Sequence, residues 1–151
     1  MTLDPKAEQR CRESFARQTA MTSLGASINA VRAGEVELVM PFSQQFTQQH
    51  GFIHAGMITT LCDTACGFAA FSLMPEDAAV LTTEFKVNFL SPADGERFVA
   101  VGRVVRPGKK LMVCLGEVFA EKAGKDGTKR KQIALMTATM MVVDTSTGLR
   151  G

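Results

Sequence analysis

The chain has 151 residues, of which 46% are hydrophobic and 21% charged, and its net charge is +2. This length fits one domain with a real core, and the hydrophobic content excludes a disordered chain. No apolar run reaches the roughly 20 residues that a transmembrane helix needs, and the mixed-charge N-terminus predicts no secretory signal. We therefore expect a cytoplasmic protein without a membrane partner, whose four cysteines are reduced and buried.

The first half of the chain predicts two helices and a hairpin. Residues Asp4 to Met21 form an amphipathic pattern, with Asp4-Pro5 as a cap and first-turn proline. Ala26–Arg32 and Glu35–Met40 alternate apolar and polar residues, which predicts a hairpin. A long loop follows over residues 41–53, and loops of this length are usually functional. His54 to Met74 is apolar on nearly every face, so this helix must be wrapped by other elements.

Four further strands are predicted in the second half, separated by turns rich in Gly and Pro. They cover residues 80–90, 97–105, 111–120 and 132–143. One buried helix with about six strands predicts an α+β fold, in which a curved antiparallel sheet wraps the helix. We expect a helical segment over residues 1–24, the main domain over 25–145 and a tail over 146–151.

Apolar residues of the last two strands are expected on both faces of the sheet. They are Met112, Cys114, Met136, Met140 and Met141. A monomer would expose one of these faces to water, so we expect a homo-oligomer.

Positive charge is concentrated between Arg103 and Lys131, where nine basic and three acidic residues give a net charge of +6. We predict no nucleic-acid partner, because Phe119 is the only aromatic residue there and no nucleic-acid-binding signature is present. The segment could form a basic rim for a phosphorylated small molecule, or it could form solvated hairpin tips. For residues 122–131 the pattern favours solvated tips.

The residues that best fit a reaction centre lie around the start of the apolar helix. A helix that begins near His54 leaves its first N–H groups unpaired, with the positive end of the helix dipole behind them. The small residues Ala55 and Gly56 let a ligand approach the backbone closely, which predicts an oxyanion site for a polarised carbonyl. Asp63 is the only carboxylate on this helix. It is either a base or nucleophile whose pKa burial displaces, or a structural residue bonded to a threonine or to the backbone.

The spacing of these groups predicts a site shared between two chains. Asp63 lies eight residues after Ala55, which is about 12 Å along a helix, so one chain cannot easily bring both to one carbonyl. Two such helices that run antiparallel across a two-fold axis would place Asp63 opposite the partner's Ala55. His50 and His54 have no third ligand nearby, so we predict no metal site, and we expect His54 to order the helix entry.

Three motifs in this order resemble the hotdog-fold acyl-CoA thioesterases of the PaaI-like (phenylacetate-degradation) branch. They are Q-x-H-G-x-x-H-A-G from Gln48, D-T-A-x-G-x-A from Asp63 and L-T-T-E-F-K-V-N-F-L-S-P-A from Leu81. The resemblance covers residues 25–143. It implies a sheet curled around the helix, dimers joined edge to edge and often tetramers, and an acyl-CoA substrate with no separate cofactor.

The resemblance also implies roles for individual residues. Ala55 and Gly56 take the place of the family's two glycines, and the Ala55 N–H would polarise the thioester carbonyl. Asp63 would act as general base or nucleophile. Gln48 stands where the family usually has Asn, which helps to hold the thioester or the water, and Thr82 stands where relatives have a Ser or Thr that orients the water. The residues implied in substrate binding are His50, His54, Arg106, Gly108, Lys109 and Lys110, the last four from a turn near the coenzyme A phosphates.

The function that these features favour is hydrolysis of an aryl- or medium- to long-chain acyl-CoA to the free acid and coenzyme A. A hotdog dehydratase acting on hydroxyacyl thioesters is an alternative, but its H-F-P-G loop is missing. A non-catalytic acyl-CoA-binding module is another, but it would have no need for a buried Asp63.

Overall fold

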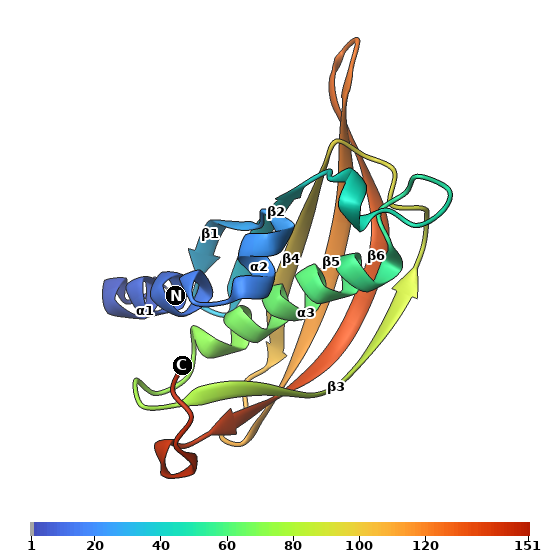
Figure 1. The fold of residues 1–151 in the computed structure, drawn as a ribbon. Helices are drawn as coiled ribbons and strands as arrows, with labels where there is room; N and C mark the ends of the chain where they lie inside the picture. Colours follow the sequence, from blue (N-terminus) through green and yellow to red (C-terminus); the bar gives the residue numbers. More distant parts are fainter. Residues whose placement is uncertain (1) are drawn as a thin grey trace.

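The computed structural model describes residues 2–151 and consists of a curved six-stranded sheet wrapped around one long helix (Figure 1). The helices are α1 (Pro5–Ala16), α2 (Thr19–Leu24), η1 (Gln44–Phe46), α3 (Ala55–Phe71) and η2 (Thr145–Thr147). The strands are β1 (Ser27–Arg32), β2 (Glu35–Pro41), β3 (Ala79–Phe89), β4 (Arg97–Arg106), β5 (Leu111–Gly124) and β6 (Gly127–Val143). The sheet order is β1-β2-β4-β5-β6-β3, and every neighbouring pair is antiparallel. This confirms the α+β architecture expected from the sequence.

The N-terminal segment forms two helices instead of the single predicted helix. Gln18 is extended, with ψ at 98°, and separates α1 from α2. A straight helix would hold Cys11 and Met21 about 80° apart around its axis. The break between the two helices lets both side chains be buried in one hydrophobic core, together with the buried residues of α3. Residue 1 of the predicted segment lies outside the described residues.

Arg10 of α1 forms hydrogen bonds with the C-terminal end of α3 and the residues that follow it. Its guanidinium donates hydrogen bonds to the carbonyl oxygens of Phe71 (2.9 Å), Met74 (2.8 Å) and Pro75 (2.6 Å), and it lies 4.4 Å from the centre of the Phe71 ring. Carbonyls at the C-terminal end of a helix lack partners within the helix, so these bonds satisfy them. They also explain how α3 can end at Phe71, before the predicted end at residue 74, without leaving its last carbonyls unpaired.

Two glycines let α3 lie directly on the sheet. Gly102 of β4 and Gly116 of β5 are direct cross-strand neighbours. A Cβ atom at Gly102 would lie 2.3 Å from the carbonyl carbon of Ala65, and one at Gly116 would lie 2.5 Å from the Sγ atom of Cys62. All four cysteines are free and buried, as predicted. Burial raises the pKa of Cys114 to about 11, so this thiol stays protonated at neutral pH.

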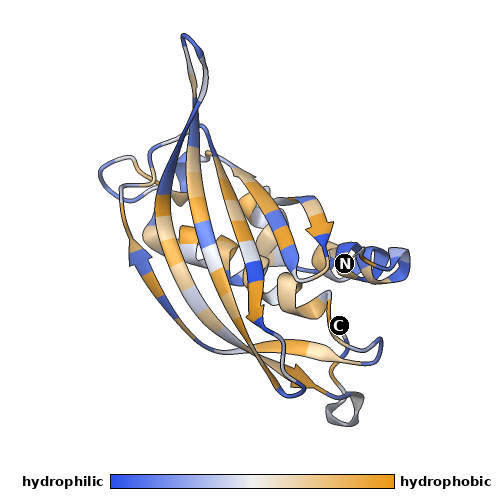
Figure 2. Ribbon diagram, turned by 180° about the vertical axis from the view of Figure 1, so that it is seen from behind, coloured by the Kyte–Doolittle hydropathy of each residue, from blue (hydrophilic) through white to orange (hydrophobic). Residues whose placement is uncertain are grey.

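Apolar residues of β5 and β6 lie on both faces of the sheet. Met112, Cys114, Met136 and Met140 are all buried on the side of α3, because they alternate along β5 and β6 in one register. Met141, the next residue of β6, points to the other face, where it is paired with the exposed Leu111, so the five residues do supply both faces, as expected. A mixed pattern of apolar and polar bands covers the outer face (Figure 2). Its exposed apolar residues include Val105, Leu111 and Val113.

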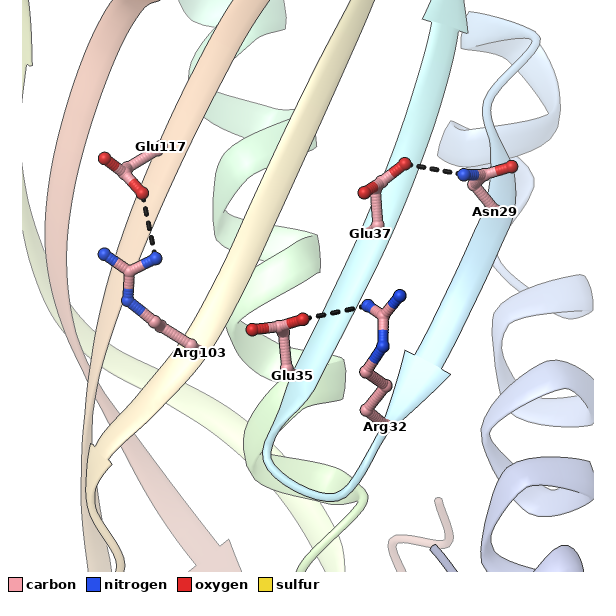
Figure 3. Close-up of polar contacts among 6 residues, drawn as sticks. All are labelled: Asn29, Arg32, Glu35, Glu37, Arg103 and Glu117. Atoms are coloured by element: carbon pink, nitrogen blue, oxygen red, sulfur yellow. Dashed lines mark hydrogen bonds and ion pairs between the residues drawn. The ribbon is translucent and has the colours of Figure 1, made fainter. Parts of the chain in front are cut away.

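Polar pairs cover the outer face of β1, β2, β4 and β5 (Figure 3). They join Arg103 to Glu117 (2.9 Å), Arg32 to Glu35 (2.9 Å) and Asn29 to Glu37 (2.6 Å). Pairs of this kind on an exposed surface add little stability, but they keep this part of the sheet compatible with water.

β5 and β6 are longer than predicted. Their pairing continues to Gly124 and Gly127, beyond the predicted limits at residues 120 and 132, and the hairpin projects from the body of the molecule (Figure 1). Among the described residues, no helix is long and apolar enough to span a membrane.

Candidate active site

His54 caps the N-terminus of α3. Its backbone is extended, with φ −58° and ψ 135°, and its Nδ1 atom accepts a hydrogen bond of 2.8 Å from the N–H of Gly56. Nδ1 therefore carries no proton in this arrangement. A side-chain cap of this kind contributes about 1 kcal/mol to the stability of a helix. The contact agrees with the expectation that His54 orders the helix entry.

The N–H of Ala55 is the open donor at this helix end. Gly56 donates to His54, whereas within residues 2–151 the Ala55 N–H has no hydrogen-bond partner. Ala55 is also exposed. The positive end of the α3 dipole lies behind this N–H, so it is suited to an oxygen atom that gains negative charge.

A pocket of about 550 Å³ opens beside Ala55. One wall comes from the loop before α3 and its first turn, and the other comes from the end of β3 and the turn that follows it. The lining residues are Gln48, Phe52, Ile53, His54, Ala55, Ile58, Phe89, Leu90, Ser91, Pro92, Ala93 and Ile133. We call this cavity the reaction pocket. Ser91 to Ala93 were not singled out as site residues from the sequence, although they end the third motif of the family resemblance.

The loop before α3 positions Gln48 in the reaction pocket. It closes through a bridge between Thr47 and Ile53, and Gly51 turns the chain with φ +85°. The Oε1 atom of Gln48 accepts a hydrogen bond of 2.5 Å from the His50 N–H, which leaves the side-chain NH₂ free to donate. His50 itself is exposed and does not line the pocket.

Asp63 and Thr82 form a second polar group, where α3 meets β3. The Oγ1 atom of Thr82 donates a hydrogen bond of 2.9 Å to the Oδ1 atom of Asp63. Burial raises the pKa of Asp63 above its ordinary value, and the hydrogen bond from Thr82 partly opposes this rise. A carboxylate of this kind can act as a base closer to neutral pH than an exposed aspartate.

Within one chain, the acid and the amide are separate. Asp63 and Thr82 do not line the reaction pocket that contains Ala55. The structure thus brings Gln48, His54 and Ala55 together, while the carboxylate lies about 12 Å further along the helix. Among the described residues, no cluster of three or more His, Cys, Asp or Glu side chains could hold a metal ion.

The turn between β4 and β5 lies at the other end of α3. Gly108 and Lys109 line a shallow cavity with Leu73 and Pro75, which follow the C-terminus of the helix. Ala55 lies about 25 Å away along the helix axis. Arg106, Lys109 and Lys110 could therefore reach a substrate at Ala55 only from a partner chain.

The curved antiparallel sheet wrapped around α3 is the hotdog fold. The chain belongs to the thioesterase superfamily, whose model matches residues 50–126. A candidate esterase of Saccharolobus solfataricus is 32% identical over 107 residues, which cover 70% of this chain and 74% of that protein. A second, from Halobacterium salinarum, is 35% identical over 98 residues, and the match covers 64% of that protein, just under two thirds.

Solved structures support the same class. A thioesterase family protein from Silicibacter pomeroyi is 53% identical, with a TM-score of 0.87, and the match covers 91% of this chain and 98% of that one. The PaaI protein of E. coli, from the phenylacetic acid degradation operon, has a TM-score of 0.80 over 94% of this chain and 96% of that one. At 22% identity, this second likeness concerns the fold. Together these relatives assign the chain to the thioester hydrolases and confirm the hotdog fold.

Proposed function

We propose that the protein hydrolyses acyl-CoA thioesters to the free acid and coenzyme A, without a cofactor. The observation that carries this proposal is the unpaired Ala55 N–H at the positive end of α3, inside an apolar pocket. A thioester oxygen that accepts from this N–H gains negative charge as the acyl carbon is attacked. The apolar walls, among them Phe52, Ile58 and Phe89, suit an aryl or aliphatic acyl group.

Asp63 supplies the other half of the proposed chemistry. As a general base it takes a proton from the attacking water; as a nucleophile it attacks the acyl carbon itself and forms a mixed anhydride, which water then hydrolyses to the free acid. Thr82 holds one carboxylate oxygen in place. The free NH₂ of Gln48 donates to the thioester or to the water, and the C–S bond then breaks to release the thiol.

We further propose that this site forms across a homodimer, alone or within a dimer of dimers, joined at β3. β3 is an edge strand of 11 residues, and on one side it has no neighbouring strand among residues 2–151. It exposes Leu81 (45%), Phe85 (43%) and Phe89 (48%). A long apolar edge is a template for pairing with another strand. The other edge strand, β1, has six residues and is packed against α1.

Antiparallel pairing of two β3 strands would complete the site. If the two-fold axis passes near Phe85, Thr82 of one strand lies opposite the end of the partner strand, about residue 88. Asp63, which is bonded to Thr82, then approaches the partner's Phe89, which lines the pocket that holds the partner's Ala55. This arrangement brings together the carboxylate and the amide that one chain holds apart.

A panel of acyl-CoAs with a thiol-detecting reagent tests the proposed reaction. We expect thiol release from aryl or medium- to long-chain substrates, with the acyl acid as the second product. A dehydratase would convert hydroxyacyl thioesters without releasing thiol, and a binding module would release none. The absence of thiol release across the panel would contradict the proposal.

Thr82→Val is expected to shift the pH dependence of kcat/KM. The hydrogen bond from Thr82 lowers the pKa of Asp63, so its loss raises this pKa further. A general base must be unprotonated, and activity therefore falls as the pH drops through its pKa. The acidic limb of the profile should therefore move to higher pH. Thr82→Ser keeps the hydroxyl and should keep the limb near its original position. An unmoved limb in the valine variant would mean that Asp63 is not the titrating base.

A further inference from the structure

A second pocket lies next to the reaction pocket, at the base of the β5–β6 hairpin. Its volume is about 670 Å³. Its lining residues are Phe52, Pro92, Asp94, Ala120, Lys122, Lys129, Arg130 and Lys131. Phe52 and Pro92 line both pockets, so the two cavities share a wall. Figure 1 shows the hairpin rising from the end of the molecule where α3 begins. We call this second cavity the lysine pocket.

Three lysines lie on the same face of the hairpin. Lys131 is paired with Ala120 and Lys129 with Lys122, and residues two apart on a strand point to the same side. Lys122 and Lys129 are directly opposite each other, an arrangement of like charges that destabilises a sheet. The three ammonium groups therefore lie around the buried Ala120, and their repulsion lowers the stability of the folded hairpin.

Little negative charge balances these lysines. Asp94 forms an ion pair of 2.5 Å with Lys122. Lys129 and Lys131 form no ion pair with any of the described residues. The neighbouring Arg130 is held differently, with its guanidinium 4.2 Å from the centre of the Phe119 ring. The pocket thus keeps an excess of positive charge that a bound anion would offset.

We propose that the lysine pocket binds the phosphate groups of the coenzyme A portion of the substrate. This inference rests on the proposed thioesterase function and adds the binding mode. Because Phe52 and Pro92 line both pockets, a substrate whose carbonyl lies at the Ala55 amide has the lysines next to it, and its thiol portion can extend past these two residues to reach them. The protomer that donates the Ala55 N–H therefore also holds the phosphates, and the partner supplies Asp63. The lysines that line this pocket therefore bind substrate instead of forming only a solvated hairpin tip. Lys109 and Lys110 of the β4–β5 turn are then not needed to bind the phosphates.

Binding of adenosine 3′,5′-bisphosphate, the phosphorylated nucleotide part of coenzyme A, tests the pocket without any reaction. Calorimetry should show that the wild-type protein binds this compound and coenzyme A. The double variant Lys129→Ala/Lys131→Ala should bind both about tenfold more weakly, because two exposed charge contacts together contribute on this scale. Lys6→Ala/Lys125→Ala removes the same charge outside the pocket and serves as the matched control. Equal weakening in the control, or none in either variant, would overturn the proposal.

Kinetics with two thiol carriers of one acyl group give a second test. For the acyl-CoA, KM should rise about tenfold in Lys129→Ala/Lys131→Ala, while kcat changes little, since these contacts are equal in the ground and transition states. For the same acyl group on pantetheine, which has no phosphate, KM should be the same in both proteins. A rise in KM for both carriers would overturn the proposal. So would an effect confined to Lys109→Ala/Lys110→Ala, because it would place the phosphates at the β4–β5 turn.

The two proposals fail in different ways. If the wild-type protein hydrolyses neither thioester, the proposed function is wrong, and the calorimetric comparison still decides whether the lysine pocket binds phosphates. If the protein hydrolyses both thioesters with equal KM, the function stands and the lysine pocket is wrong.

Discussion

Replacement of Asp63 with alanine is expected to lower kcat by about 100-fold or more, the usual scale for loss of a general acid or base. The carboxylate is the only one on α3, and it lies beside Thr82 at the free edge of the sheet. Steady-state thiol release with the best substrate of the acyl-CoA panel measures the effect. A kcat near the wild-type value would remove Asp63 from the reaction.

The Asp63 variants should remain folded. Burial raises the pKa of Asp63 in the folded protein, so folding favours the protonated form. Stability from this group is therefore present at low pH and is lost as the pH rises through the raised pKa. Burial penalises the charged form of this partly buried carboxylate, so its removal should lower the free energy of unfolding little. Asp63→Asn, which keeps the shape and loses the charge, should show the same loss of kcat. Thermal unfolding and size-exclusion chromatography of both variants provide the control.

Mixing two inactive variants is expected to restore activity if each site takes its acid and its amide from different chains. One variant is Asp63→Ala, and the other is Ala55→Pro, which deletes the backbone donor. A mixed dimer then has one site with both defects and one site with neither. Random pairing makes about half of the dimers mixed, so activity should recover to about a quarter of wild type.

The structure favours Ala55→Pro as a clean deletion of the N–H. Ala55 is the first residue of α3, where proline is well tolerated, and the preceding His54 has the extended backbone that a residue before proline needs. Asp4 and Pro5 form the same arrangement at the start of α1, with Asp4 at ψ 129°. The His54 cap bonds the Gly56 N–H and is left in place. Ala55→Gly, which keeps the donor, is the matched active control.

The mixing experiment can be interpreted only if mixed dimers are shown to form. The two variants carry different affinity tags, and sequential purification shows that they associate. Each variant alone must be oligomeric and inactive. Absence of recovery in verified mixed dimers would mean that acid and amide belong to one chain, and the antiparallel arrangement of the two α3 helices would be wrong.

Much of the local structure could be predicted because it depends on the pattern of apolar and polar residues that are close together in the sequence. The long apolar run of residues 54–74 and the alternation in the strands indicate which segments are helical or extended. The small residues after His54 and the lone Asp63 on an apolar helix mark the two halves of the candidate site. The separation of Asp63 from Ala55 also follows from helix geometry, because eight residues of helix have a fixed length.

Other features depend on contacts between residues far apart in the chain. Two helices replace the predicted one because burial of Cys11 and Met21 together outweighs a continuous helix. The face on which Met112 and Met140 lie is a matter of strand register, and a one-residue change in register moves every side chain to the other face.

The sequence by itself determined most of the secondary elements, the wrapped helix and the residue types of the site, since these follow from short-range patterns and chemistry. Only the tertiary structure decided which cations lie near the reaction pocket. Lys109 and Lys110 lie beyond the far end of α3, whereas Lys129 and Lys131 lie next to the pocket wall at Phe52 and Pro92. The physical reason is the sheet order, because antiparallel pairing of β4, β5 and β6 sends successive turns to opposite ends of the sheet.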